Sequence, residues 1–293
     1  MAVKRLLVMS GKGGTGKTTV MASLAALAEH PILADCDVDA PDLHLLLKPE
    51  VQETREYYGL QTASLDGSLC TMCGLCRQVC RYDAISNDIT IDEVSCEGCS
   101  ACTIVCPEDA ITMKDTVTGE VYISTTRLGP MAHARLKAGE EASGKLVMEV
   151  RGASDDLAVE HGSELVLIDG PPGIGCPAIS ALSGVDAILI VAEPTLSGRQ
   201  GMSRVVELAE HFAIPAMAVV NRAELNPEVA TVIEHWCTGQ GVTVFDRLPY
   251  DRAATDAMVA MKTVVEYNDG PLAQSLRALG ERLFEALEEY SQR

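Results

Sequence analysis

Gly11-Lys12-Gly13-Gly14-Thr15-Gly16-Lys17-Thr18-Thr19 decides the fold of this 293-residue chain. The stretch fits G-x-x-x-x-G-K-[ST], in which glycines let the backbone curl so that several N–H groups face phosphate groups. The apolar residues 5–9 precede it directly, and a helical pattern over residues 17–29 includes its end and continues beyond it. A strand, a loop and a helix in this order indicate a nucleotide-binding α/β domain. Lys17 is expected to reach the β- and γ-phosphates, and the Thr18 hydroxyl to bind Mg²⁺.

Further apolar runs follow the loop, with helical patterns between them. They cover residues 31–35, 145–150, 165–169, 187–193 and 216–221. Continuous apolar runs of this length are typical of buried strands in a parallel sheet. The sequence therefore predicts an α/β fold with a mostly parallel, doubly wound sheet, and a site at the carboxyl ends of its strands.

Eight of the eleven cysteines form two runs with the same spacing, C-x2-C-x2-C-x3-C. In bacterial ferredoxins this spacing lets three thiolates of one run bind one [4Fe-4S] cluster while the fourth binds the other cluster. The expected ligand sets are therefore crossed: Cys70, Cys73, Cys76 and Cys106 for one cluster, and Cys80, Cys96, Cys99 and Cys102 for the other. Zinc bound by paired CxxC units and disulfides in a secreted domain are the alternatives.

The repeat extends beyond the cysteines, because residues 82–85 follow the first run as residues 108–111 follow the second. Two copies of one unit are typical of a small two-cluster domain. We therefore predict an inserted α+β ferredoxin-like domain over residues 64–114. The nucleotide-binding domain is then discontinuous and comprises residues 1–63 and 115–293.

The charge of the chain limits its partners. It carries 42 acidic and 23 basic residues, a net charge of -19, which opposes binding to nucleic acid or to anionic membranes. The last helical pattern, residues 272–290, has an acidic polar face, which favours packing on the protein's own core over a membrane anchor. Because the first apolar run ends in the glycine loop, no export signal is expected, and the many thiols then favour the cytoplasm.

The second lysine of the loop, Lys12, makes the sequence resemble the deviant Walker A ATPases, which include MinD, ParA, the nitrogenase iron protein and the Mrp-type iron-sulfur carriers. The resemblance covers nearly the whole chain. In that family the lysine equivalent to Lys12 reaches the nucleotide of the partner subunit in a dimer. The resemblance therefore implies that Lys12 stabilises charge on the transferring phosphoryl group. A solvated loop lysine is the alternative.

The same resemblance gives roles to two acids at strand ends. Asp37, after the second strand, matches the position that orients the attacking water or the Mg²⁺ shell. Asp169, at the end of a later strand, matches the Walker B acid that holds Mg²⁺ through water, and Gly170 is expected to sense the γ-phosphate. Without the resemblance, the acids around Asp37 could be helix-capping residues.

Two later segments match the adenine side of the family's site. The residues expected to bind ATP or ADP are Gly11, Lys12, Gly13, Gly14, Thr15, Gly16, Lys17, Thr18, Thr19, Gly170, Asn221, Arg222, Pro249 and Tyr250. Those expected to act in hydrolysis are Lys12, Lys17, Asp37 and Asp169, and those expected at Mg²⁺ are Thr18, Asp37 and Asp169.

Three features lie outside these assignments. Cys176 has the same offset from Asp169 as a switch-linked cluster ligand in the nitrogenase iron protein. The segment 129–147, which contains His133, resembles the members of the family that carry an inserted ferredoxin domain. Arg81 follows Cys80 where a proline often follows the last cysteine of a run.

The chain looks most like the members with such an insert. It is therefore expected to be a Mg-dependent ATPase, slow without a partner, whose nucleotide-dependent dimer switch is coupled to electron transfer through two [4Fe-4S] clusters. The dimer is homomeric or pairs the chain with a related ATPase. A redox or iron-sulfur client protein is expected as a further partner. The alternatives are an iron-sulfur cluster assembly factor or carrier of the Mrp type, and a MinD/ParA-like spatial organiser with redox-sensing clusters.

Overall fold

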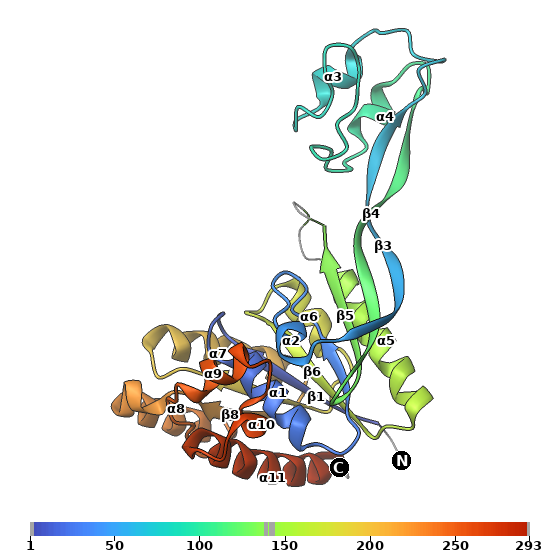
Figure 1. Ribbon diagram of the computed structural model, residues 1–293. Helices are drawn as coiled ribbons and strands as arrows, with labels where there is room; N and C mark the ends of the chain where they lie inside the picture. Colours follow the sequence, from blue (N-terminus) through green and yellow to red (C-terminus); the bar gives the residue numbers. More distant parts are fainter. Residues whose placement is uncertain (1–2, 138–139, 141–143, 292–293) are drawn as a thin grey trace. The chain divides into compact units, whose positions relative to one another are not determined.

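The computed structural model describes residues 3–137, 140 and 144–291 (Figure 1). The chain forms two compact units. The larger unit contains the described residues of 1–54, 121–135 and 142–293, and the smaller unit those of 55–120 and 136–141. No helix in the described part of the chain is long and apolar enough to cross a membrane.

The strands are β1 (Lys4–Ser10), β2 (Ile32–Asp35), β3 (Glu50–Leu65), β4 (Ile111–Thr126), β5 (Gly129–Leu136), β6 (Leu165–Pro172), β7 (Ala187–Ala192), β8 (Ala216–Val220) and β9 (Thr243–Val244). The helices are α1 (Lys17–Leu27), α2 (Leu43–Leu47), α3 (Leu75–Val79), α4 (Ala101–Val105), α5 (Gly144–His161), α6 (Cys176–Leu182), α7 (Leu196–His211), α8 (Pro227–Gly239), α9 (Ala253–Val259), α10 (Val264–Tyr267) and α11 (Pro271–Ser291), with a 3-10 turn at Ala223–Leu225.

The strands form one sheet in the order β3-β4-β5-β2-β6-β1-β7-β8-β9. Strand β1 pairs in parallel with β6 and β7, β2 with β5 and β6, and β8 with β7 and β9. The prediction of an α/β fold with a mostly parallel sheet is confirmed. Since β1 lies between strands that follow it at long intervals in the chain, the loop after β1 lies at the point where ligands bind in such sheets.

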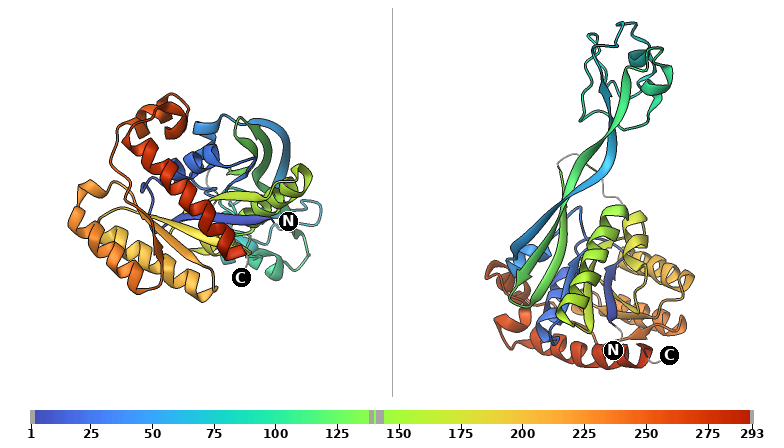
Figure 2. Two further views of the ribbon diagram at one scale, coloured as in Figure 1. Left: turned by 90° about the horizontal axis from the view of Figure 1, so that it is seen from below. Right: turned by 90° about the vertical axis from the view of Figure 1, so that its right-hand side faces the viewer.

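Helices cover both faces of the sheet in the larger unit. Successive side chains of a buried strand point to opposite faces, so each face presents apolar side chains that a helix layer can bury. Leu6 and Val8 of β1 belong to a hydrophobic core built with α1, α2, α10 and α11. Helices α5, α6, α7 and α8 also pack on the strands but contribute no residue to that core. They therefore cover the opposite face (Figure 2).

Residues 145–150 are the first turns of helix α5, so the prediction of a strand there is wrong. Leu146, Val147 and Val150 are buried, and Leu157 continues the same face two turns later. The spacing of three and four residues is helical, but a run of six residues is too short to reveal it. The long strands β3 and β4 were not predicted either, because most of β3 is exposed and contains no continuous apolar run.

The smaller unit has a very small apolar core. Among its described residues, the buried apolar cluster consists of Ala63, Cys76, Ile85, Ile89, Cys102 and Ile111. Helices α3 and α4 pack on each other, and Ile85 forms an isolated antiparallel bridge with Ile91. A core of this size rarely stabilises a folded unit without disulfides, a metal or another cross-link.

The sequence repeat of the smaller unit is also a repeat of its backbone. Residues with positive φ occur in pairs that have the same offset as Cys70 and Cys96: Met72 with Gly98, Gly74 with Ser100, and Asp83 with Asp109. In each copy a left-handed residue therefore precedes the short helix at its N-cap.

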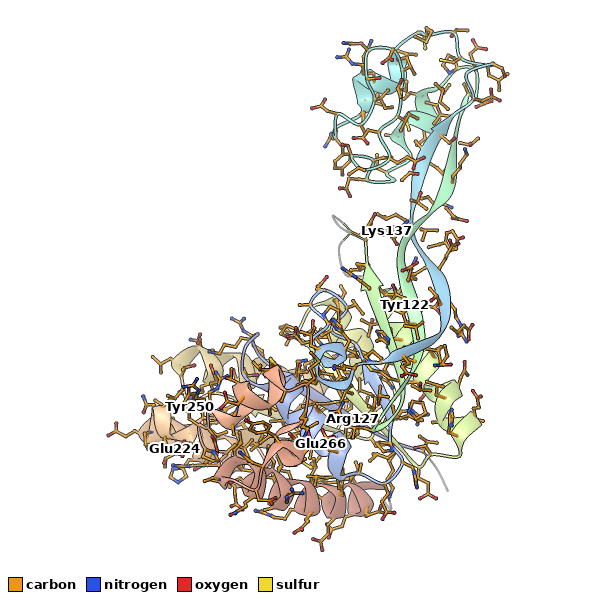
Figure 3. All side chains as sticks on the ribbon, in the orientation of Figure 1. Tyr122, Arg127, Lys137, Glu224, Tyr250 and Glu266 are labelled. Carbon is orange, nitrogen blue, oxygen red and sulfur yellow. The ribbon has the colours of Figure 1, made fainter. Side chains whose placement is uncertain are left out.

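An ion pair joins distant segments of the larger unit. Arg127, in the turn between β4 and β5, forms two hydrogen bonds of 2.8 Å with the carboxylate of Glu266 on α10 (Figure 3). Arg127 also donates to the carbonyl oxygen of Leu46 at 2.9 Å, so it ties α2 to α10. The hydrogen bonds from Arg127 lower the pKa of Glu266 to about 2.

Replacing this carboxylate should make stability less dependent on acid. Because the pKa of Glu266 is depressed, its contribution is present above its ordinary pKa and is lost as pH falls through about 2. Glu266→Gln should lower the free energy of unfolding by about 1–2 kcal/mol at pH 7, and by progressively less as the pH falls below about 4. Urea titrations at pH 7 and below about pH 4 measure the change in the free energy of unfolding. Asp256→Asn in the exposed Arg252–Asp256 pair is the control. A difference that stays constant with pH would contradict the assignment.

Candidate functional site

The glycine loop connects β1 to α1. Gly16, the N-cap of α1, has a φ of 90° and offers no side chain to the first N–H groups of the helix. These groups then carry partial positive charge, which suits a phosphate. The Thr15 hydroxyl is buried and has no hydrogen-bond partner among the described residues.

The loop lies directly against helix α7. A Cβ atom added at Gly11 would lie 2.1 Å from the backbone carbon of Gly201. Only a glycine at both positions allows the two backbones to approach this closely. Contact with helix α7 therefore restricts the position of the loop.

Lys17 joins the loop to the neighbouring strand. Its Nζ lies 2.6 Å from Oδ1 of Asp169 at the end of β6 and 3.5 Å from Oδ2 of Asp37. The Thr18 hydroxyl donates to Oδ2 of Asp169 at 2.7 Å. The structure thus brings together four residues that the sequence assigned to catalysis or Mg²⁺.

A third acid lies behind this group. Asp35 pairs with Asp169 in the register of β2 and β6, and its buried carboxylate accepts the N–H of Asp37 at 3.1 Å. Burial and then the charge of Asp169 raise the pKa of Asp35 well above its ordinary value. Burial also raises the pKa of Asp37, against the opposing charge of Lys17.

Lys17 remains charged in this setting. Burial lowers its pKa, but the carboxylates of Asp169 and Asp37 raise it by more, so the pKa lies above its ordinary value. One cation therefore faces three carboxyl groups. Carboxylate and hydroxyl oxygens with this deficit of positive charge fit a hard divalent cation such as Mg²⁺.

Lys12 points away from this group and contacts its own subunit. Its Nζ lies 3.0 Å from Oε2 of Glu193, and 3.4 Å from the hydroxyl oxygens of both Thr195 and Ser197. The other oxygen of Glu193 lies 2.5 Å from Nη1 of Arg222. Sequence reasoning did not single out Glu193, although an acid directly after an apolar strand was the available signal.

The residues predicted for the base side line one open cavity of about 450 Å³ beside the loop. Gly16, Thr19, Asn221, Arg222, Pro249 and Tyr250 all contribute to its wall. Asn221 also braces the loop, because its Nδ2 donates to the carbonyl oxygen of Thr15 at 2.8 Å. A second residue that was not predicted, Glu224, accepts the N–H of Tyr250 at 2.8 Å and so positions the tyrosine (Figure 3).

The smaller unit contains two mainly apolar cavities, each lined by four cysteines. Cys80, Cys96, Cys99 and Cys102 line one of about 360 Å³. Cys70, Cys73, Cys76 and Cys106 line the other, of about 310 Å³. The structure therefore groups the eight cysteines as two crossed sets, three from one run and one from the other.

The chemistry of these cavities fits thiolate-bound clusters. Backbone N–H groups point at three of the sulfurs: Ala110 at Cys106 (3.3 Å), Met72 at Cys70 (3.4 Å) and Ala63 at Cys96 (3.5 Å). Such hydrogen bonds stabilise negative charge on a thiolate and tune cluster potentials. All eleven cysteines carry free thiols. Among the described residues, no three His, Cys, Asp or Glu side chains converge closely enough to hold a single metal ion.

The features outside the main assignment occupy different places. His133 of β5 is buried, stacks on Tyr122 with ring centroids 5.1 Å apart, and lies 2.8 Å from the Ser124 hydroxyl. Burial lowers the pKa of His133 to about 4, so it is a neutral packed residue at pH 7. Cys176 is exposed at the start of α6.

A family model described as the CobQ/CobB/MinD/ParA nucleotide binding domain matches residues 6–264. The chain belongs to this family. The match runs through the loop, the two acidic strand ends and the base-side cavity. It therefore covers every residue named above for the larger unit's site.

Relatives and solved structures agree with this membership. An uncharacterized protein of Methanocaldococcus jannaschii is 32% identical over 286 residues, 97% of each chain. An iron-sulfur cluster carrier protein of Pyrococcus horikoshii is 26% identical over 144 residues, 45% of this chain and 49% of the relative. The structure of the septum site-determining protein MinD complexed with Mg-ADP, also from Pyrococcus horikoshii, is similar with a TM-score of 0.60 and 18% identity, over 96% of each chain. That last likeness shows the fold.

The contact between the loop and α7 yields a prediction with a matched control. Gly11→Ala should lower the free energy of unfolding by about 1–3 kcal/mol and weaken ADP binding, because the new methyl group must displace backbone. Gly13→Ala should change stability little, since a Cβ atom there meets nothing within 4 Å. Thermal unfolding and titration with a fluorescent ADP measure both effects. Equal behaviour of the two variants would show that the approach of Gly201 is not limiting.

Proposed function

We propose that the protein binds and hydrolyses Mg-ATP in a dimer and couples this switch to electron transfer through two [4Fe-4S] clusters. The observation that carries the proposal is the crossed grouping of eight cysteines around two cavities in a chain of the MinD/ParA family. A stable electron-transfer site needs a complete thiolate set for each cluster, and each cavity has four.

The nucleotide half of the proposal follows from the charges around the loop. The ammonium group of Lys17 pairs with the carboxylates of Asp169 and Asp37. When ATP binds, this group can exchange a carboxylate for phosphate oxygens. Thr18 and Asp169 would then hold Mg²⁺, which neutralises phosphate charge when bound. Asp37, which is partly exposed, would orient the attacking water.

The dimer half rests on the surface around the loop. Gly13 and Gly14 are exposed, and Lys12 is 32% exposed beside them. Leu196 lies between the two hydroxyl residues that contact Lys12 and is 74% exposed, and Ile174, which follows Asp169 by a short turn, is 41% exposed. Exposed apolar side chains at a functional loop are typical of a surface that a second copy or a related chain covers.

In the smaller unit, the two crossed cysteine sets would hold the clusters. Each cluster, when bound, accepts and donates one electron at a time. The protein's own contribution is the N–H groups aimed at the sulfurs and the apolar walls that exclude water. Cys73 and Cys99 are exposed, which leaves one edge of each cavity open to a redox partner.

A second candidate function is an iron-sulfur cluster carrier. The similarity to the Pyrococcus horikoshii carrier protein supports it, although that match covers 45% of this chain. The exposed Cys176 would have to provide the transfer site, one thiolate from each subunit. Two thiolates make a labile site, whereas four cysteines around each cavity favour retention and electron transfer.

Single serine variants test the crossed sets. Cys106→Ser should remove the same cluster as Cys73→Ser, although these residues belong to different runs, and each should halve the iron content. Cys80→Ser and Cys99→Ser should remove the other cluster. Electron paramagnetic resonance of the reduced variants shows which cluster signal remains. Pairing by run, with Cys73 and Cys80 removing the same signal, would contradict the crossed assignment.

Cys176→Ser is the control for these variants and separates the two functions. It should leave iron content and ATP hydrolysis nearly unchanged. Loss of cluster transfer to an apo-ferredoxin in this variant would favour the carrier.

Coupling between the two halves is measured by the reduction potentials with and without Mg-ATP. If nucleotide affinity differs tenfold between redox states, one-electron potentials shift by about 59 mV. Lys17→Ala should abolish nucleotide binding and the shift while iron content stays normal. Unchanged potentials in the wild-type protein would leave the two units as independent modules, and retained hydrolysis in Lys17→Ala would contradict the site.

A further inference from the structure

Glu193 holds two cationic side chains that come from distant parts of the chain. Its carboxylate is 13% exposed and lies between Lys12 of the glycine loop and Arg222 of the base side. Each oxygen faces one cation, at 3.0 Å and 2.5 Å respectively. Neither cation has another carboxylate partner among the ion pairs of the described residues.

The backbone fixes where this carboxylate starts. Glu193 precedes Pro194, which restricts it to an extended conformation. Its carbonyl oxygen accepts the N–H of Thr195 at 2.8 Å, and a Cβ atom added at Gly198 would lie 2.3 Å from that oxygen. The turn between β7 and α7 is thus closely packed, and Glu193 cannot follow Lys12 if the lysine moves outward.

Lys12 has a set of polar contacts within its own subunit. In the described part of the chain, its ammonium group contacts Glu193 and the hydroxyls of Thr195 and Ser197. A lysine that acts on a partner's nucleotide must leave these contacts. The ion pair therefore competes with the dimer.

We propose that Glu193 is a positioning residue that holds Lys12 in the single subunit, so that a partner's nucleotide must replace the carboxylate at Lys12 before the dimer closes. This inference rests on the dimer switch of the proposed function. The carboxylate also separates two like charges, because Lys12 and Arg222 would face each other without it. Removing its charge should thus push Lys12 outward as well as release it.

The test is the association of the protein with Mg²⁺ and a non-hydrolysable ATP analogue, followed by sedimentation velocity over a range of concentrations. Glu193→Gln should tighten the dimer about fivefold per subunit, the size expected of a partly exposed ion pair, and so roughly 25-fold for two subunits. If Glu193 only stabilised the turn, Glu193→Gln would instead lower the affinity of the dimer, because a damaged turn weakens the association.

Glu288→Gln is the matched control. It removes the same charge from a chain of net charge -19, so it reports any gain that comes only from reduced repulsion. Glu288 pairs with Lys4 at the amino end of β1, the end opposite to the loop. Glu193→Asp provides a second variant that keeps the charge but is too short to reach both cations, and it should tighten the dimer by less than the glutamine.

The outcomes separate the two proposals. A dimer in Glu193→Gln that is no tighter than in Glu288→Gln overturns the role of Glu193 while the dimer switch stands. A wild-type protein that stays monomeric while Glu193→Gln dimerises supports the role. If neither the wild type nor any variant dimerises with the analogue, a switch based on a homodimer and the role of Glu193 in it are both overturned.

Discussion

The buried pair between Lys17 and Asp169 is the interaction on which the rest of the larger unit depends. It joins the loop after β1 to the end of β6, and the two strands pair along most of their length. Removing Lys17 would leave the carboxyl groups of Asp169, Asp37 and Asp35 without the cation that they face, which is destabilising. The same pair makes the site responsive, because a phosphate that draws Lys17 away changes the charge felt by Asp169, Asp37 and Asp35 together. Stability without ligand and sensitivity to ligand therefore come from one contact.

The smaller unit depends on a different constraint, the lack of an apolar core. A buried apolar cluster of six residues, two of them cysteines, is too small to offset the conformational entropy of the segment. The left-handed residues that recur in both halves turn the chain back at matching points, and this brings three cysteines of one run together with one from the other. The cavities between them are then gaps in the core that a cluster would fill.

Much of this could be predicted from the sequence, because the features are local. Glycines and lysines at fixed spacing predict the loop, apolar runs predict most of the central strands, and the spacing of cysteines predicts their crossed grouping. Residues 145–150 were predicted wrongly, since six residues with four apolar ones fit both a buried strand and a helix face. Strands β3 and β4 were not predicted, because exposed and charged residues interrupt any apolar pattern in their sequences. Pairing in the sheet stabilises these strands instead.

By itself, the sequence determined the α/β class, the position of the phosphate loop and the identity of the strand-end acids, since each depends on residues close together in the chain. Only the tertiary structure decided which acid meets which cation. Lys12 and Glu193 follow strands β1 and β7, which are far apart in sequence and adjacent in the sheet, and Arg222 follows β8, the next strand in the sheet. The order of strands sets these distances, and strand order depends on how the whole core packs, which no local pattern contains.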